Sequence, residues 1–309
     1  MTKKRYYDLN TYYRSLYGCR VQKITIDAGM TCPNRDGRLG TGGCIYCNEK
    51  GSGTGAFMRG ESIQEQLEKG KQFFAKRYNA KKFIAYFQSY TNTYGSLDHL
   101  DRIYQQALHV NDVVGLSIGT RPDCISEPIL DLLKSYTSTH LIWLEYGLQS
   151  SHDTTLFHIH RGHNFACFEH AVEQTRNKGL PVCVHVILGL PGETHKMMSE
   201  TAKKLANMNI DGIKIHLLYV VKDTILDHMY QQGNYACLEQ DEYVNIVCDF
   251  LELLPNSTVI QRLTGDPHFS ELVAPLWSLQ KAETLSMIDR TLEIKNSWQG
   301  KRHKTIQQF

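Results

Sequence analysis

The sequence predicts an α/β fold, an open, partial (β/α)6 barrel of the TIM type followed by a C-terminal extension. Between residues 24 and 220, six short apolar runs alternate with segments of helical periodicity, which is typical of a buried parallel sheet. Polar or glycine-rich motifs follow all six runs, as functional loops follow the strands of a barrel. A doubly wound sheet would gather such motifs at one switch point, so their spread favours the barrel.

The first predicted strand covers residues 24–29, after a basic, tyrosine-rich segment at residues 1–23. That segment is interpreted as a helix packed on the outside of the domain. The competing interpretation is a nucleic-acid contact, because cations bind phosphates and aromatic rings stack on bases.

The other elements of the barrel follow in a regular order. A capping box, Ser62 with Glu65, begins a predicted helix at 62–78. The glycine-rich stretch 51–55 lacks the Gly-Lys-Ser/Thr ending of a phosphate loop, so we interpret it as a turn. Further strands are predicted at 83–87, 113–120, 141–148, 182–188 and 213–220, and helices at 97–108, from 128, at 164–178 and at 195–208.

Residues 221–309 break this rhythm and are interpreted as an extension packed on the barrel, with a helix at 241–254, a short strand at 259–263 and a helix at 276–294. The extension ends in a basic tail without an acidic residue. The tail is either an RNA contact or a solvated chain end. Its candidate RNA-binding residues are Lys295, Trp298, Lys301, Arg302 and Lys304.

The composition is that of an ordinary globular protein. The chain has 309 residues, 41% of them hydrophobic, and a net charge of +2, which argues neither for nor against a nucleic-acid partner. Nine cysteines, an odd number, do not suggest a disulfide framework and fit a reducing cytoplasm. The N-terminus lacks a signal-peptide pattern, and no run of apolar residues is long enough for a membrane span. We therefore expect a cytoplasmic protein without membrane contact.

Three cysteines follow the first predicted strand, Cys32, Cys44 and Cys47, at the spacing C-x11-C-x2-C. Thiolates ligate iron–sulfur clusters, and three of them leave one iron of a [4Fe–4S] cluster open for a substrate or cofactor. Structural zinc requires four ligands, and Cys19 could be the fourth. The spacing alone supports the two alternatives equally.

Tyr46, directly before the last cysteine, gives the loop a resemblance to the radical S-adenosylmethionine (radical SAM) superfamily. The usual spacing there is C-x3-C-x2-C, and the wider first gap resembles the Elongator catalytic subunit group. Motifs at the strand ends occur in the order of that group, and the resemblance covers about residues 15–300. The chain most closely resembles the bacterial YtqA/YhcC type, which includes MnmL-type enzymes that modify the tRNA wobble uridine. The motifs are Thr120 to Asp123, Gln149 with Ser150, Arg161 to His163, Gly189 to Thr194, and Lys214 with Ile215.

The resemblance implies a [4Fe–4S] cluster on Cys32, Cys44 and Cys47, with S-adenosyl-L-methionine (SAM) bound at its open iron and cleaved reductively to a 5′-deoxyadenosyl radical. Arg161 is a candidate for the methionine carboxylate, because a guanidinium matches a carboxylate as a fork. The candidate cofactor-binding residues are Tyr46, Gln88, Ser89, Tyr90, Thr91, Thr120, Gln149, Ser150, Arg161, Leu190 and Pro191.

Candidate substrate contacts stand on the last two predicted strands: His185, Lys214, His216 and Tyr219. Lys214 and His216 share one face of their strand. A satisfied core residue is the competing interpretation for each histidine. Glu145 lies inside an apolar strand and needs a partner there, so a structural ion pair and a role in the site are equally supported.

The function that the resemblance implies is radical chemistry on the tRNA wobble uridine. The expected reaction converts 5-carboxymethylaminomethyl(-2-thio)uridine to 5-aminomethyl(-2-thio)uridine, with electrons from a flavodoxin- or ferredoxin-type donor. One alternative is a radical SAM enzyme that acts on a peptide or small molecule. The other is a zinc-stapled RNA-binding module with Cys19, Cys32, Cys44 and Cys47 as ligands.

Overall fold

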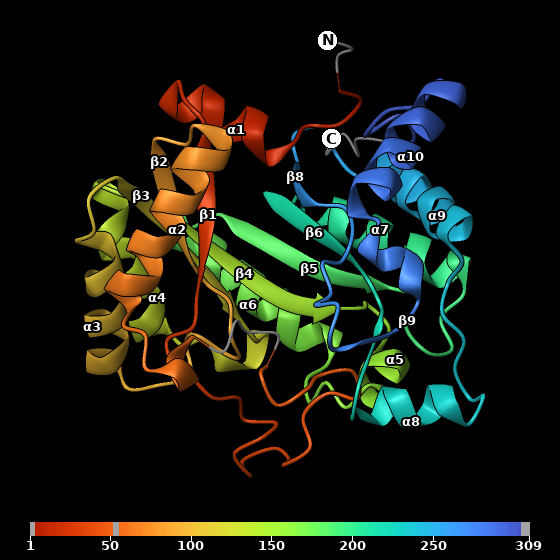
Figure 1. Cartoon of the computed structure of the whole chain (residues 1–309), viewed down its shortest axis with the longest axis horizontal. Coiled ribbons are helices and arrows are strands. Elements are labelled where there is room, and N and C mark those ends of the chain that lie inside the picture. Colours follow the sequence, from red (N-terminus) through yellow and green to blue (C-terminus); the bar gives the residue numbers. More distant parts are fainter. Residues whose placement is uncertain (1–3, 52–55, 304–309) are drawn as a thin grey trace.

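A curved parallel sheet forms the centre of the protein. The structure is a computed structural model that describes residues 4–51 and 56–303. Within these residues the sheet has seven strands, all parallel, in the order β1-β2-β3-β4-β5-β6-β8 (Figure 1). The strands are β1 (Val21–Ile26), β2 (Lys82–Phe87), β3 (Val113–Thr120), β4 (Leu141–Gln149), β5 (Val182–Leu188), β6 (Gly212–Leu217) and β8 (Val259–Arg262).

Helices cover the outer, convex face of the sheet and leave its inner face as the lumen of an open half-barrel (Figure 1). The capping box at Ser62 and Glu65 is confirmed at the start of α2. These outer helices are α2 (Ile63–Tyr78), α3 (Leu97–Leu108), α4 (Glu127–Ser135), α6 (Phe165–Asn177), α7 (His195–Asn207) and α9 (Gln240–Leu253), and α10 (Lys281–Ile294) packs on α9. Four 3-10 turns complete the main elements: Phe57–Arg59, Pro122–Cys124, Tyr136–Ser138 and Leu276–Leu279.

Helix α1 (Leu9–Tyr17) lies across the N-terminal end of the barrel. Its Tyr13 is buried, and Tyr12 meets Trp143 of β4 edge-on, with ring centroids 5.6 Å apart. These rings fill the N-terminal end of the lumen. Tyr13 is therefore a core residue and is not available for stacking on bases.

The fold class is confirmed, but the sheet contains one strand more than the sequence predicts. The additional strand, β8, comes from the extension and pairs with β6. The sequence predicts this strand at 259–263 but not its place in the sheet, because its polar residues Gln261 and Arg262 interrupt the apolar run that is typical of a barrel strand. The predicted strand at 213–220 ends at Leu217, and the short strand that begins at Val220 pairs with the extension.

Four further elements were not predicted: the short helices α5 (Asp153–His158) and α8 (Ile225–Gln231), and the antiparallel pair β7 (Val220–Val221) and β9 (Leu272–Ala274). The first strand begins and ends three residues earlier than expected. No helix in the described ranges is long and apolar enough to cross a membrane.

Candidate active site

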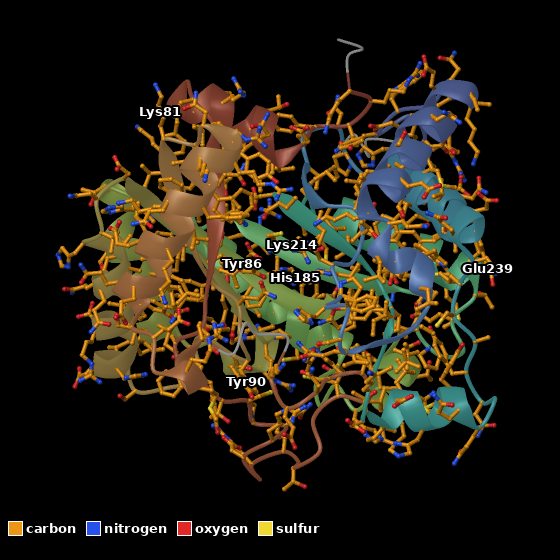
Figure 2. All side chains as sticks on the ribbon, viewed as in Figure 1. Lys81, Tyr86, Tyr90, His185, Lys214 and Glu239 are labelled. Carbon is orange, nitrogen blue, oxygen red and sulfur yellow. The ribbon has the colours of Figure 1, made fainter. Side chains whose placement is uncertain are left out.

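A cavity of about 320 Å³ opens at the carboxyl ends of the strands, between the sheet and the cysteine loop. The loop forms its outer wall, and inward-facing side chains of β2, β4, β5, β6 and β8 form its inner end. Figure 2 shows Tyr86, His185 and Lys214 together in the middle of the molecule, and Tyr90 beside the loop. The predicted position of the site at this end of the barrel agrees with this geometry.

Cys32, Cys44 and Cys47 all line this cavity, and their thiols are free. Arg35 holds the loop closed, because its Nη2 donates to the carbonyl oxygens of Cys47 and Asn48 at 2.6 and 2.7 Å. The packing leaves no room for a side chain at Gly43, where an added Cβ would lie 2.9 Å from Arg35 Nε. The loop is thus folded around its three thiols.

The three loop thiols are not as close together as the ligands of one zinc ion. Tetrahedral Zn–S bonds of about 2.3 Å place thiolates about 3.8 Å apart. In the described ranges, the one group of three His, Cys, Asp or Glu ligand atoms within 4.8 Å of each other is Glu145, Cys183 and His185. The loop thiols are outside that limit, which suits a multi-iron core.

Cys19 is not a fourth ligand in this structure. It stands before β1, whereas the loop follows β1, and a six-residue strand spans about 20 Å. The structure therefore disfavours the four-cysteine zinc module.

Arg161 connects the cysteine loop to β4. Its Nε and Nη2 donate to the Gly147 carbonyl oxygen at 3.1 and 2.6 Å, and its Nη1 lies 3.7 Å from Cys44 Sγ. Burial works against the charge, but the Cys44 thiol and other neighbours raise the pKa of Arg161. A fixed positive charge therefore lies against the predicted cluster ligands.

Seven predicted cofactor-binding residues line the cavity: Tyr46, Gln88, Tyr90, Thr91, Thr120, Gln149 and Arg161. Tyr90 and Gln149 have positive φ angles of 62° and 78°, a conformation that non-glycine residues rarely adopt and that clusters at functional sites.

The other four do not line the cavity: Ser89, Ser150, Leu190 and Pro191. Ser89 is fully buried, and the Ser150 hydroxyl donates to Glu193. Leu190 belongs to an apolar cluster beneath the loop.

Among the predicted substrate contacts, His185, His216 and Tyr219 line the cavity and Lys214 does not. Lys214 lies just beside it, with its Nζ 3.8 Å from the centre of the Tyr86 ring. Lys214 instead forms an ion pair with Glu145.

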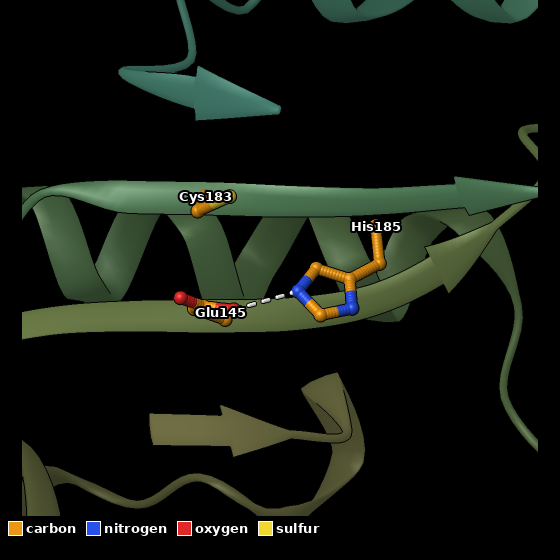
Figure 3. A group of neighbouring side chains, drawn as sticks. All are labelled: Glu145, Cys183 and His185. Atoms are coloured by element: carbon orange, nitrogen blue, oxygen red, sulfur yellow. Dashed lines mark hydrogen bonds and ion pairs between the residues drawn. The ribbon is translucent and has the colours of Figure 1, made fainter. Parts of the chain in front are cut away.

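Glu145 is the centre of a buried polar network in the lumen. Its side chain is fully buried, Lys23 Nζ lies 2.5 Å from its Oε1, and His185 Nε2 lies 2.8 Å from its Oε2. Lys23 Nζ also donates to Gln261 Oε1 at 2.5 Å. Figure 3 shows His185 and Cys183 of β5 facing Glu145 of β4. Two lysines thus compensate the negative charge of Glu145. Both interpretations of Glu145 therefore agree with the structure, because the residue is ion-paired and also lines the cavity.

Burial sets the protonation states of this network. It lowers the pKa of His185 to about 4, assisted by Lys214 and opposed by Glu145. It lowers the pKa of Lys23 to about 8, opposed mainly by Glu145. Burial works against the charge of Glu145, but Lys214 and Lys23 hold its pKa well below the usual range. Near pH 7 the network therefore contains an ionised Glu145 and a neutral His185.

We expect acid to destabilise the protein partly through His185. The unfolded histidine titrates near pH 6.5, whereas native His185 stays neutral down to about pH 4. Between these values the unfolded state binds the additional proton, so the free energy of unfolding falls by up to about 1.4 kcal/mol per pH unit as the pH falls. Urea unfolding at pH 7, 5.5 and 4.5 should therefore show a flatter pH dependence for His185→Asn. The exposed control His170→Asn should match the wild type, and an unflattened His185→Asn profile would contradict this expectation.

The basic tail lies at the opposite end of the barrel from the cavity, beside the N-terminal segment (Figure 1). Lys295 Nζ lies 3.7 Å from an Asp249 oxygen, and Arg302 Nη1 lies 3.3 Å from a Glu252 oxygen. Gln299, buried in the tail, donates to the carbonyl oxygens of residues 255 and 258. Lys301 Nζ stands 5.3 Å from the Trp298 ring centre, and Lys304 lies outside the described residues. As far as residue 303, the tail is a docked turn with partly compensated charge.

Sequence reasoning missed Arg262 as a lining residue because it assigned β8 to the extension packed on the barrel and not to the barrel sheet. Arg262 lines the cavity next to the network. The sequence signal for this role of Arg262 is that two polar residues, Gln261 and Arg262, end a short apolar strand.

Comparisons with known proteins agree with this architecture. The family model described as "Radical SAM superfamily" matches residues 35–205, and the "Radical_SAM C-terminal domain" matches residues 210–294. The chain is 40% identical to the Bacillus subtilis (strain 168) protein YtqA over 99% of this chain and 95% of that one. It is 38% identical to the Escherichia coli (strain K12) protein YhcC, covering 89% of this chain and 88% of that one.

This chain covers only part of the length of more distant relatives. The tRNA uridine(34) acetyltransferase of Dehalococcoides mccartyi (strain CBDB1) is 29% identical over 56% of this chain, which covers 37% of that protein. The archaeal Methanocaldococcus infernus Elp3 structure superposes with a TM-score of 0.70 at 17% identity, covering 90% of this chain and 64% of that one. That superposition supports the fold.

The superfamily's cofactors, a [4Fe–4S] cluster and SAM, are implied by this membership, and three free thiols at the mouth of a half-barrel fit them. With more than half of the chain matched by the superfamily model and nearly all of it by YtqA, the chain belongs to the radical SAM superfamily of enzymes, in the group related to Elp3-like tRNA uridine-modifying proteins.

Proposed function

We propose that this enzyme converts 5-carboxymethylaminomethyluridine, or its 2-thio form, at the tRNA wobble position to 5-aminomethyluridine. Its relatives include proteins named for tRNA uridine(34), and its similarity to YtqA extends over nearly the whole chain. The observation that carries the proposal is the cavity itself, which joins three free thiols at the mouth to a lumen rich in cations. Such a lumen suits a substrate side chain that ends in a carboxylate.

Cys32, Cys44 and Cys47 would hold the cluster, with SAM at its open iron. Together these groups would supply the one-electron chemistry that removes a hydrogen atom from the carbon between the side-chain amine and the carboxylate. Return of one electron to the protein's redox centre would leave an imine at this position. Water would hydrolyse the imine to the 5-aminomethyl group and release the two-carbon fragment as glyoxylate. A flavodoxin- or ferredoxin-type protein is the electron donor in this proposal.

The cavity residues have two separable tasks. Gln88, Thr120 and Gln149 present polar groups at the ends of three neighbouring strands, where they would orient the cofactor. Arg161, fixed between Gly147 and Cys44, adds a positive charge for the methionine carboxylate.

The inner end of the lumen keeps the reacting centre away from bulk water. Glu145 is saturated by Lys23, Lys214 and His185, so the polar network needs no water to satisfy the carboxylate. The wobble base has to leave the anticodon stack and enter from the mouth, as bases do in enzymes that modify them.

Nucleoside analysis of tRNA from cells that lack this protein tests the proposal. We expect the 5-carboxymethylaminomethyl nucleoside to accumulate and the 5-aminomethyl nucleoside to disappear. The wild-type gene should restore the pattern, and a Cys44→Ala gene should not. An unchanged nucleoside profile in the deletion strain would refute the proposed substrate.

We also propose that the basic tail contacts the body of the tRNA, away from the anticodon. Replacing Lys295, Lys301 and Arg302 with glutamine is then expected to weaken binding of full-length tRNA. The slope of log K against log salt is negative, and it should become shallower by about 0.9 for each phosphate that the variant no longer binds. Filter binding at several salt concentrations measures both quantities.

An isolated anticodon stem-loop provides the control, because its wobble base enters at the other end of the barrel. The triple variant should bind the stem-loop like the wild type. If full-length tRNA also keeps its affinity and slope, the tail does not contact RNA. The exposed Arg38 and Lys222 near the mouth would then be the next candidates.

A further inference from the structure

Arg262 reaches the lumen because β8 contains a bulge. Gly212 pairs with Val259 and Ile213 with Ile260, but the next residue of β6, Lys214, pairs with Arg262. Gln261 is therefore the additional residue on β8. A bulge turns consecutive side chains toward one face and often re-aims a side chain beside an active site. Gln261 binds Lys23 inside the lumen, and Arg262 lines the cavity.

Arg262 also lacks a partner that would occupy its guanidinium. Four arginines line the cavity, and the other three are engaged: Arg35 with backbone carbonyls, Arg121 with Asp123, and Arg161 with Gly147. In the described part of the chain, Arg262 has neither an ion pair nor a side-chain hydrogen bond.

The two acidic residues on the same wall are already paired elsewhere. Asp266 lies 2.7 Å from Lys281 Nζ, and Glu271 is bound to Lys50. Glu145, deeper in the lumen, is shared by two lysines. The positive charge of Arg262 is thus left for a group that enters the cavity.

His216 stands beside Arg262 and carries the second unused group. Its Nε2 is buried and makes no hydrogen bond within the described residues. Burial, together with the nearby charge of Arg262, holds the pKa of His216 well below its usual range, so the ring is neutral. Its ring centre lies 5.3 Å from that of His185. Arg262, with an unused guanidinium, and His216, with an unused imidazole nitrogen, therefore both line the cavity.

We propose that Arg262 binds the carboxylate at the end of the substrate's 5-carboxymethylaminomethyl side chain, with His216 Nε2 as a neighbouring hydrogen-bonding group. This inference rests on the proposed function. A guanidinium binds a carboxylate as a two-pronged fork, and a half-buried cation without its partner favours ligands that carry the negative charge over ligands that lack it. The 5-aminomethyl product has no carboxylate, so the same residue favours binding of substrate over retention of product.

The methionine carboxylate of SAM is the other carboxylate that the cavity would receive. Arg161 is the nearer candidate for it, because its Nη1 lies 3.7 Å from a predicted cluster ligand. Arg262 stands on β8, at one edge of the sheet, whereas the cysteine loop follows β1 at the other edge. SAM affinity therefore distinguishes the two sources, and Arg262→Gln should leave it unchanged.

The test uses the reconstituted holoenzyme and three anticodon stem-loop RNAs. The first carries 5-carboxymethylaminomethyluridine, the second the methyl ester of that side chain, and the third unmodified uridine. The wild type should bind the carboxylate RNA about tenfold to hundredfold more tightly than the ester RNA. Arg262→Gln should lose that preference but bind the ester RNA normally. Arg262→Lys should keep part of the preference, and the exposed control Arg102→Gln should keep all of it.

The inference is overturned if Arg262→Gln retains the wild-type preference, or if the wild type shows no preference for the carboxylate over the ester. A loss of SAM affinity in Arg262→Gln would also overturn it, because Arg262 would then serve the cofactor. Conversion of the carboxylate RNA by the wild type is measured in parallel. Its failure refutes the proposed reaction, whereas conversion without an Arg262-dependent preference refutes only the role of Arg262.

Discussion

Replacing Cys32, Cys44 or Cys47 with alanine is expected to abolish assembly of the cluster, whereas Cys19→Ala should leave the iron content unchanged. The three loop thiols line one cavity, and Cys19 stands at the other end of β1. Each loop cysteine is one of only three protein ligands in this account, so the loss of one exposes a second iron. Iron and sulfide content after anaerobic reconstitution, with the visible absorbance of the cluster, measures the effect.

The folded state of these variants provides the control. Far-UV circular dichroism and the thermal unfolding of the iron-free proteins should stay close to those of the iron-free wild type, because each change to alanine removes a single sulfur atom. If Cys19→Ala loses as much iron as the loop variants, the three-ligand assignment is wrong. Stoichiometric zinc in a colourless preparation would instead support the zinc module.

Replacing Glu145 with alanine is expected to cost about 3–5 kcal/mol of unfolding free energy. Lys23 and Lys214 would remain buried without a counter-charge, and His185 would lose its hydrogen-bond partner. Urea unfolding at pH 7 should therefore show a much lower midpoint with a similar slope. The exposed control Glu173→Ala should change stability by less than about 0.5 kcal/mol.

A double variant separates charge from packing in this network. Glu145→Leu combined with Lys214→Met removes one charge of each sign and keeps most of the buried volume. We expect it to be more stable than Glu145→Leu alone, because only Lys23 keeps an uncompensated charge. The opposite result is a double variant that is less stable than Glu145→Leu by as much as Lys214→Met alone destabilises the wild type. That result would show that the ion pair is not the source of the effect.

The strands that could be predicted from the sequence are those in which a local run of apolar residues coincides with burial in the sheet. Runs such as 83–87 and 182–188 are almost entirely apolar, so they identify buried parallel strands without any knowledge of their neighbours. The strand at 259–263 is assigned to the extension because residues after 221 break the strand–helix rhythm, whereas in the structure it pairs with β6. α5 and α8, with six and seven residues, are too short to show a helical period.

The motifs at the strand ends could be predicted from the sequence, but the pairing of side chains from distant strands could not. The cysteines and Arg161 stand in recognisable motifs, and the structure brings them to one cavity. Glu145, in contrast, is paired with Lys23 and Lys214, which lie 122 and 69 residues away in the sequence. Such pairs depend on the curvature of the sheet, which brings β1, β4 and β6 to one lumen, and no local pattern specifies that curvature.

Conversion of a defined tRNA by the purified enzyme tests the central claim most directly. The anaerobically reconstituted protein is incubated with SAM, a reductant and tRNA that carries 5-carboxymethylaminomethyluridine, and the nucleosides are identified by mass spectrometry. We predict 5-aminomethyluridine in the presence of SAM, and none with the Cys44→Ala protein or without SAM. An unchanged wobble nucleoside, under conditions in which the wild-type enzyme cleaves SAM, would contradict the claim that this tRNA side chain is its substrate.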